Sequence, residues 1–175
     1  MTAIQAWIVA ILVTSAAAGA GVWYTQVHAY YEEVGAPASY VLADAEGVPV
    51  RAVEVQGFQG IDSGSSPIRY RACFTTTEPL DALAQRFEGY EDPRPLNAPG
   101  WFDCYDAEAI GDALESGQGR AFLSAKDVRY GIDRVVAVLP DGRGFAWHQI
   151  NACGEVVFDG DPAPEGCPPV PERLE

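Results

Sequence analysis

The sequence predicts an α+β protein, in which one N-terminal transmembrane helix precedes a small, mostly antiparallel sheet domain with two helices and two disulfides. An uncharged apolar segment opens the chain, short β-branched runs separated by turn residues follow it, and all four cysteines lie beyond the apolar segment. The 175 residues suffice for one domain besides the anchor. We therefore divide the chain into a transmembrane anchor (1–24), a stalk (25–39), an α+β domain (40–160) and a proline-rich tail (161–175).

The anchor is predicted from Ala3–Trp23, 21 residues without a charged side chain. As a helix they span about 32 Å, which matches the hydrocarbon core of a bilayer. Trp7 near one end, with Trp23 and Tyr24 at the other, fits aromatic anchoring at both interfaces. A cleavable signal peptide is the alternative, because residues 18–20 read Ala-Gly-Ala. The long apolar run and the lack of a preceding basic residue favour an anchor.

Small residues dominate the second half of the anchor. Ser15 and Gly19 are four residues apart, as are Ala17 and Gly21, so each pair lies on one helical face. Such spacing lets the backbone of another helix approach closely, which predicts packing against a membrane partner. The alternative is a lone span in which small residues are accidental.

The stalk is expected to continue the helix until Gly35 and Pro37, with Tyr30 and Tyr31 near the headgroups. In the domain, the run 68–76 alternates so that Cys73 falls on the less apolar face of a half-buried strand. Apolar spacing predicts helices near 79–87 and 105–116, and a hairpin turn at 140–144. We expect strands at 40–44, 48–58, 68–76, 120–125, 134–139, 145–150 and 155–158.

The cysteines indicate an oxidising compartment, because their number is even and no C-x-x-C pair is present. Three pairings are possible. We favour Cys73 with Cys104 and Cys153 with Cys167, since the second bond would hold the proline-rich tail against the last strand. These bonds place the C-terminal domain outside the cytoplasm. Metal or redox chemistry is the alternative, in which Cys104 before a helix would be a reactive thiol.

Candidate catalytic residues are sparse. The domain has one histidine, His148, and no nucleophile-elbow motif accompanies it. Asp103, Asp106 and Glu108 cluster beside an aromatic pair and are compatible with a sugar or cation site, although helix capping and solvation explain them too. Asp159 and Asp161 resemble only half of a calcium loop. We therefore expect no catalytic residues, no cofactor and no metal.

The loop Pro95–Cys104 presents Trp101 and Phe102 within a rigid proline and glycine frame. Aromatic residues on such loops are typical interface anchors. They are equally typical of a loop that covers its own sheet.

All charged residues lie beyond the anchor, in the stalk, the domain and the tail. The sequence has 25 acidic and 11 basic residues, a formal net charge of -14, and its first charged residue is Glu32. No two basic residues are adjacent, so no basic stripe is available and nucleic acid is excluded as a partner. An acidic surface attracts basic proteins, such as a c-type cytochrome, or serves solubility alone.

Three segments, PLNAPGWFDCYDAEAIGDAL, YGIDRVVAVLPDGRGFAWHQIN and PEGCPP, resemble an uncharacterised alphaproteobacterial family of single-span membrane proteins. Members are sometimes labelled histidine kinase, but this sequence has no kinase ATP-binding motif. The resemblance implies a single-pass inner-membrane protein and no defined activity.

Two functions follow as the main hypotheses, and a hydrolase that uses Asp103, Asp106 or His148 is a third. The first is a non-catalytic accessory or assembly subunit of a larger inner-membrane complex, respiratory or photosynthetic, with its C-terminal domain in the periplasm. The second is a free-standing periplasmic module that binds a basic protein or small ligand through the Trp101 loop.

Overall fold

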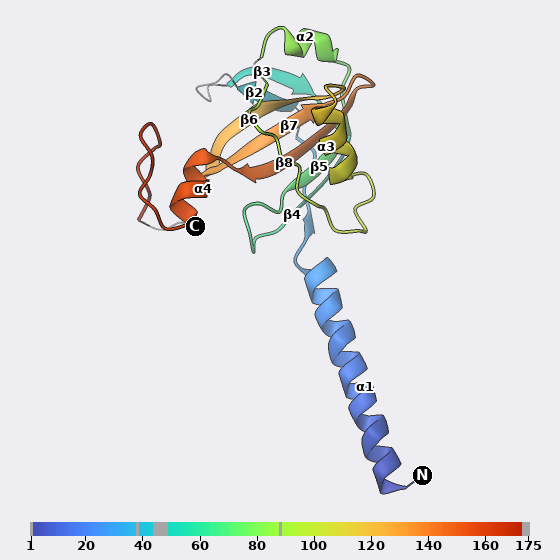
Figure 1. Cartoon of the computed structure of the whole chain (residues 1–175). Helices are drawn as coiled ribbons and strands as arrows, with labels where there is room; N and C mark the ends of the chain where they lie inside the picture. Colours follow the sequence, from blue (N-terminus) through green and yellow to red (C-terminus); the bar gives the residue numbers. More distant parts are fainter. Residues whose placement is uncertain (1, 38, 44–48, 88, 173–175) are drawn as a thin grey trace.

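Helix α1 (Ala3–Tyr24) leaves the domain as a straight rod in the computed structural model, which describes residues 2–37, 39–43, 49–87 and 89–172 (Figure 1). Its first turn is closed by a capping box, because the Thr2 hydroxyl accepts from the Gln5 amide and the Gln5 side chain accepts from the Thr2 amide. The segment Ala3–His28 is long and apolar enough to cross a membrane, and no residue of α1 is buried.

The helix ends earlier than the sequence suggested. A single π-helical turn, η1 (Thr25–Ala29), follows α1, and Glu32–Glu33 then form strand β1. This short strand pairs antiparallel with residues 61 and 62, and the Val34 amide donates to the Gly60 carbonyl over 3.0 Å. The expected helical stalk to Gly35 is therefore wrong, because pairing with an open sheet edge supplies the backbone partners that a longer helix would have used.

Within the described residues, eight strands form two antiparallel sheets. The larger sheet has the order β1-β4-β5-β8-β7-β6, and β2 and β3 form a separate pair. The remaining strands are β2 (Ser39–Ala43), β3 (Pro49–Glu54), β4 (Gln56–Asp62), β5 (Arg71–Thr75), β6 (Arg120–Arg129), β7 (Ile132–Val138) and β8 (Arg143–Ile150).

The strand expected at 48–58 is divided between the two sheets. β3 ends at Glu54 and β4 begins at Gln56, where the register with β5 shifts before Gln59. Gly57 lies within this irregularity with φ +59°, a conformation that favours glycine. The chain thus changes sheet without a loop. Residue 44 of the first expected strand and residue 48 of the second lie outside the described residues.

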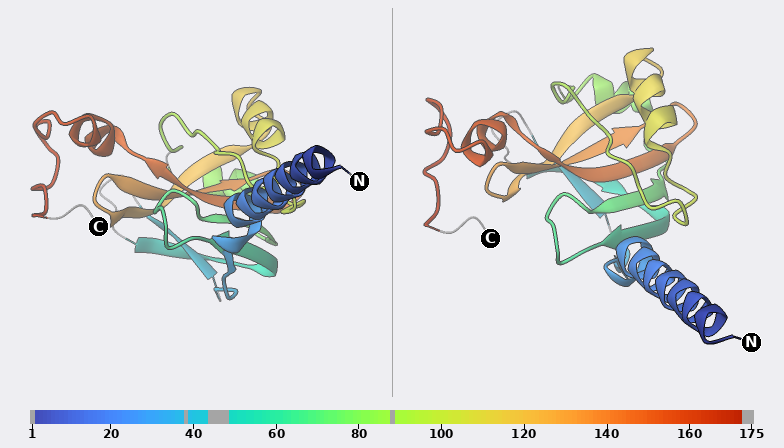
Figure 2. Two further views of the ribbon diagram at one scale, coloured as in Figure 1. Left: turned by 90° about the horizontal axis from the view of Figure 1, so that it is seen from below. Right: turned by 60° about the horizontal axis from the view of Figure 1, so that its bottom comes forward.

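Both faces of the large sheet are covered, as Figure 2 shows from below. The β2–β3 pair and α2 (Leu80–Ala84) cover one face, through Leu42, Val53 and Leu83. Helix α3 (Ala107–Glu115) and the loop before it cover the other, through Ile110 and Phe102. A strand does form within the expected range 68–76, but its expected half burial is wrong, because both faces of β5 lie in the core and Cys73 is only 7% exposed.

The predicted α+β class is confirmed, as are the helices near 79–87 and 105–116 and the β7–β8 hairpin. The strand expected at 155–158 is wrong, because Ala152–Phe158 form helix α4. The Asn151 side chain accepts from the amides of Cys153 and Gly154, over 3.1 and 3.0 Å, and so caps this helix. Gly154 also packs directly on Gly131, where a side chain would overlap the facing backbone.

Candidate functional site

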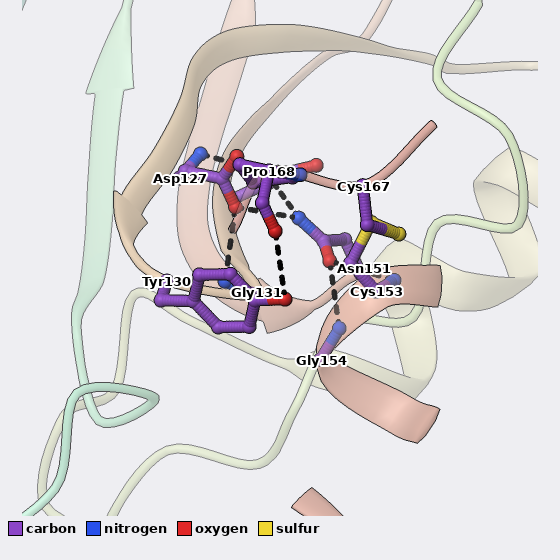
Figure 3. Close-up of a disulfide and its surroundings, with 9 residues drawn as sticks. Asp127, Tyr130, Gly131, Asn151, Cys153, Gly154, Cys167 and Pro168 are labelled. Carbon is purple, nitrogen blue, oxygen red and sulfur yellow. Dashed lines mark hydrogen bonds between the residues drawn. A yellow bond between two sulfur atoms is a disulfide. The ribbon is translucent and has the colours of Figure 1, made fainter. Parts of the chain in front are cut away.

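The four cysteines form the two disulfides favoured from the sequence, Cys73–Cys104 and Cys153–Cys167. Figure 3 shows the second bond beside Asn151, where it joins the start of α4 to the tail. The Tyr130 hydroxyl donates to the Pro168 carbonyl over 3.3 Å and holds the tail at a second point. This disulfide therefore fastens the tail to a helix rather than to a strand.

Trp101 joins the domain to the end of the apolar helix. Its indole Nε1 donates to the Val27 carbonyl over 2.7 Å, one of the carbonyls left without a partner where a helix ends. Its ring stacks on His28 with centroids 5.6 Å apart and meets the Tyr31 ring edge-on at 6.0 Å. Trp101 is therefore half-buried against its own chain.

The same loop continues into the core. Phe102 is 7% exposed and packs with Ile110 and Trp147, and Cys104 is bonded to Cys73 on β5. A short covalent and packed path therefore links η1 to the centre of the sheet. In this conformation the aromatic pair covers its own sheet and helix end, which is the second of the two interpretations of this loop.

The predicted helix-packing residues Ser15, Ala17, Gly19 and Gly21 are all exposed on α1. A Cβ atom added at Gly19 or Gly21 would meet, apart from its chain neighbours and the nearby backbone of its own helix, no described atom within 4 Å. The small-residue faces are thus open along their length.

A polar pocket of about 610 Å³ lies between β1, the loop that follows β4, and the β6–β7 hairpin. Arg134 and His148, which are directly opposite each other on β7 and β8, form its inner wall. The Arg134 Nε donates to the His148 Nε2 over 3.1 Å, and its guanidinium carbon lies 4.8 Å from the centre of the Tyr70 ring. The guanidinium is thus held in one orientation.

These contacts determine the protonation state of His148. A guanidinium can only donate, so the His148 Nε2 must accept, and the proton lies on Nδ1, which donates to the Pro67 carbonyl over 2.7 Å. The pKa of His148 is lowered to about 4, mainly by burial and also by the positive charges of Arg134 and Arg71, while the Pro67 hydrogen bond and the Asp62 carboxylate oppose this shift. Neutral His148 is therefore a fixed acceptor that orients Arg134.

The acidic residues near α4 are occupied by contacts within the chain. Asp133 Oδ1 accepts from the Asp127 amide and from Asn151 Nδ2, over 2.9 and 2.8 Å, and its Oδ2 accepts from the Tyr90 hydroxyl over 2.9 Å. Burial and the nearby Asp133 carboxylate raise the pKa of Tyr90. The described residues contain no group of three or more His, Cys, Asp or Glu side chains placed to hold a metal ion. The hydrogen bonds of Asp133 therefore join the N-cap of α4 to the β6–β7 hairpin.

The other acidic candidates are not gathered into a site. Asp106 caps α3 by accepting from the amides of Glu108 and Ala109, each over 3.1 Å. Asp103 and Glu108 are exposed, as are Asp159 and Asp161 at the end of α4. Capping and solvation account for them.

Sequence reasoning missed Arg134 and the serine-rich loop 63–66. A signal was available, because the predicted hairpin at 140–144 places Arg134 opposite His148 once its register is set by Leu139 and Arg143, which share a 2.9 Å backbone bond.

A family model described as "Family of unknown function (DUF6446)" matches residues 41–168. The matched part includes both disulfides and, apart from Glu32 and Val34, all residues that line the Arg134 pocket. No curated protein and no solved structure matches the chain.

Proposed function

Because this chain belongs to that family of unknown function, we propose its role from its own geometry: a non-catalytic accessory or assembly subunit of a larger inner-membrane complex. In this proposal α1 crosses the membrane once and the domain lies in the periplasm. The apolar length of Ala3–His28 supports the span. The two disulfides support an oxidising compartment for the domain.

The observation that carries this proposal is the joint between Trp101 and the end of the helix. A flexible tether suffices for a module that only has to stay near a membrane. Here the Trp101–Val27 hydrogen bond, the Trp101–His28 stack and the β1–β4 pairing all restrain the connection. A subunit that contacts a partner both inside and above the membrane needs such a fixed orientation.

The helix supplies the first contact surface. None of its residues is buried by its own chain, and the Thr14 hydroxyl is satisfied by the Ala10 carbonyl at 2.9 Å. Small residues at positions 15 and 19, and at 17 and 21, leave two faces on which a partner helix can approach closely.

The acidic domain supplies the second surface. The chain has a formal net charge of -14, all of it beyond α1, which favours a basic partner, and a c-type cytochrome of a respiratory or photosynthetic complex fits this chemistry. Attraction of this kind acts mainly on the rate of association and weakens with salt.

Purification in mild detergent, followed by mass spectrometry, tests the subunit proposal. We expect a membrane protein to accompany the chain in fixed ratio. The double variants Ser15→Leu/Gly19→Leu and Ala17→Leu/Gly21→Leu each block one small-residue face, and we expect at least one of them to abolish recovery of the partner. Ala16→Leu/Ala20→Leu is the matched control, because at about 100° per residue these alanines fall between the two faces.

A monomeric chain without a partner would contradict the subunit proposal. The Arg134 pocket favours the second candidate, a free-standing binding module, in that case. A turnover that is lost in His148→Gln would contradict the non-catalytic part of the proposal.

A further inference from the structure

The Arg134 pocket carries an inference that is independent of membership in a complex. Its inner wall presents a guanidinium that is oriented before any ligand arrives, by His148 Nε2 at 3.1 Å and by the Tyr70 ring at 4.8 Å. Tyr70 is itself fixed, because its hydroxyl is hydrogen-bonded to the buried Tyr40. A preoriented guanidinium matches the planar or tetrahedral oxygens of carboxylate and phosphate groups.

Within the described residues, the arginines of this pocket form no ion pair. Ion pairs among the described residues involve Arg94 and Arg143, and neither Arg134 nor Arg129, which also lines the pocket, has a carboxylate within ion-pair distance. Hydroxyl groups add further polar partners, since Ser63 and Ser65 line the same space with their oxygens 2.8 Å apart. The inner wall is therefore complementary to an anionic group.

Two carboxylates line the same pocket from other strands. Glu32 on β1 and Asp62 at the end of β4 are directly opposite each other, whereas Arg129 and Arg134 lie on β6 and β7. One Asp62 oxygen accepts from the Ser63 amide at 2.7 Å, which holds the carboxylate in place. Carboxylates here disfavour a polyanion and complement a positively charged group on the same ligand.

The loop between β4 and β5 extends from the sheet on the same side of the domain as α1 (Figure 1). Strand β1 follows η1 after two residues, so the pocket residue Glu32 also lies close in sequence to the end of the apolar helix. If α1 spans a membrane, the pocket is within reach of its surface.

We propose that this pocket binds a phosphate diester that carries an amine, with the phosphate on Arg134 and Arg129 and the ammonium facing Glu32 and Asp62. Such a group occurs as the headgroup of an ethanolamine phospholipid and as a free glycerophosphodiester. Both sources share this chemistry.

Calorimetric titration of the full chain in detergent tests the chemistry. We expect glycerophosphoethanolamine to bind, and glycerophosphoglycerol, which lacks the amine, to bind several-fold more weakly. Arg134→Gln should lower the affinity for glycerophosphoethanolamine at least about tenfold, since charge-assisted hydrogen bonds to phosphate are lost. Asp62→Asn should reduce the preference between the two diesters. Arg143→Gln is the control, because Arg143 is exposed, pairs with Asp141 and lies outside this pocket.

Arg129→Gln provides a variant that leaves the core intact, because Arg129 is exposed. We expect it to weaken binding about three- to tenfold without lowering the melting temperature. Equal binding of both diesters, no binding at all, or unchanged affinity in both arginine variants would overturn the proposal.

Lipid analysis of the purified chain distinguishes the two sources. Ethanolamine phospholipid that is retained by the unmodified chain and lost from Arg134→Gln identifies a headgroup as the ligand. Binding of glycerophosphoethanolamine in the calorimetric titration, without retained phospholipid, identifies a free glycerophosphodiester as the ligand. A failure of both tests contradicts the pocket assignment and leaves the co-purification test of the subunit proposal unaffected.

Discussion

The Trp101 indole nitrogen donates a 2.7 Å hydrogen bond to the carbonyl of Val27, a residue 74 positions earlier in the chain. Val27 lies in the π-helical turn that ends the apolar segment, and Trp101 lies three residues before a cysteine bonded to the central sheet. One side chain therefore connects the segment suited to a membrane with the core of the domain. The proposed function depends on this connection.

Loosening the joint should expose the segment around β1. Trp101→Phe keeps an aromatic ring and loses the hydrogen bond, worth about 1 kcal/mol, so opening should increase about fivefold. Trp101→Ala also loses the stack on His28 and should open further. The rate of cleavage after Glu32 and Glu33 by a glutamate-specific protease measures this opening. Trp7→Phe, at the far end of α1, should leave the rate unchanged.

The two disulfides should differ in what they stabilise. Each disulfide closes a loop in the unfolded chain. Removing either bond should therefore lower the free energy of unfolding by about 3 to 4 kcal/mol, through the larger conformational entropy of the unfolded state. Cys73→Ala/Cys104→Ala acts on a bond in the core and should lower the melting temperature of the whole domain. Cys153→Ala/Cys167→Ala should lower it less and accelerate cleavage at Glu165 in the exposed tail. The reverse order of melting temperatures would contradict this assignment.

Acid should destabilise the domain through His148. Its pKa is about 4 in the folded chain and about 6.5 when unfolded, so the unfolded state binds more protons between these values. The stabilisation is complete above pH 6.5 and is lost as the pH falls toward 4, by about 3 kcal/mol in total. Urea unfolding across this range should show a smaller loss for His148→Gln. His28→Gln, which changes the other histidine, should retain the full loss.

The contact between α4 and the β6–β7 hairpin should depend on Gly131 and Gly154, which face each other. Gly131 has φ +72° and would bring a side chain onto the Gly154 backbone, so Gly131→Ala should cost about 3 kcal/mol or more. Gly117 has nearly the same φ, +71°, with open space around it, so Gly117→Ala should cost only about 1 kcal/mol. Urea unfolding of both variants separates packing from backbone strain. Equal losses would show that packing contributes nothing.

Local patterns were sufficient for α1 and for the β7–β8 hairpin. The favoured disulfide pairing is found too, although Cys153 lies in helix α4 and not in the strand on which that preference was based. α1 follows from an uncharged run of bilayer length, and the hairpin follows from two alternating runs around Gly142, whose φ is +84°. These features depend on neighbours in the sequence, which is why the sequence reveals them.

The remaining features depend on tertiary partners. Val156 and Val157 favour a strand by propensity, but the Asn151 cap and the Gly131–Gly154 contact select a helix. Glu32 and Glu33 have no strand pattern and pair only because β4 offers an edge. The Arg134 pocket required the register of two strands and the position of a loop from a third, which composition does not reveal.

The distance between α1 and the domain tests the central claim most directly, namely that helix and domain move as one body. Spin labels at Val13→Cys and Glu108→Cys, both exposed positions, report this distance by pulsed electron resonance in lipid nanodiscs. We predict a single narrow distance distribution that broadens when Trp101 is changed to alanine. A distribution that is already broad in the otherwise unmodified chain, and unchanged by Trp101→Ala, would contradict the account.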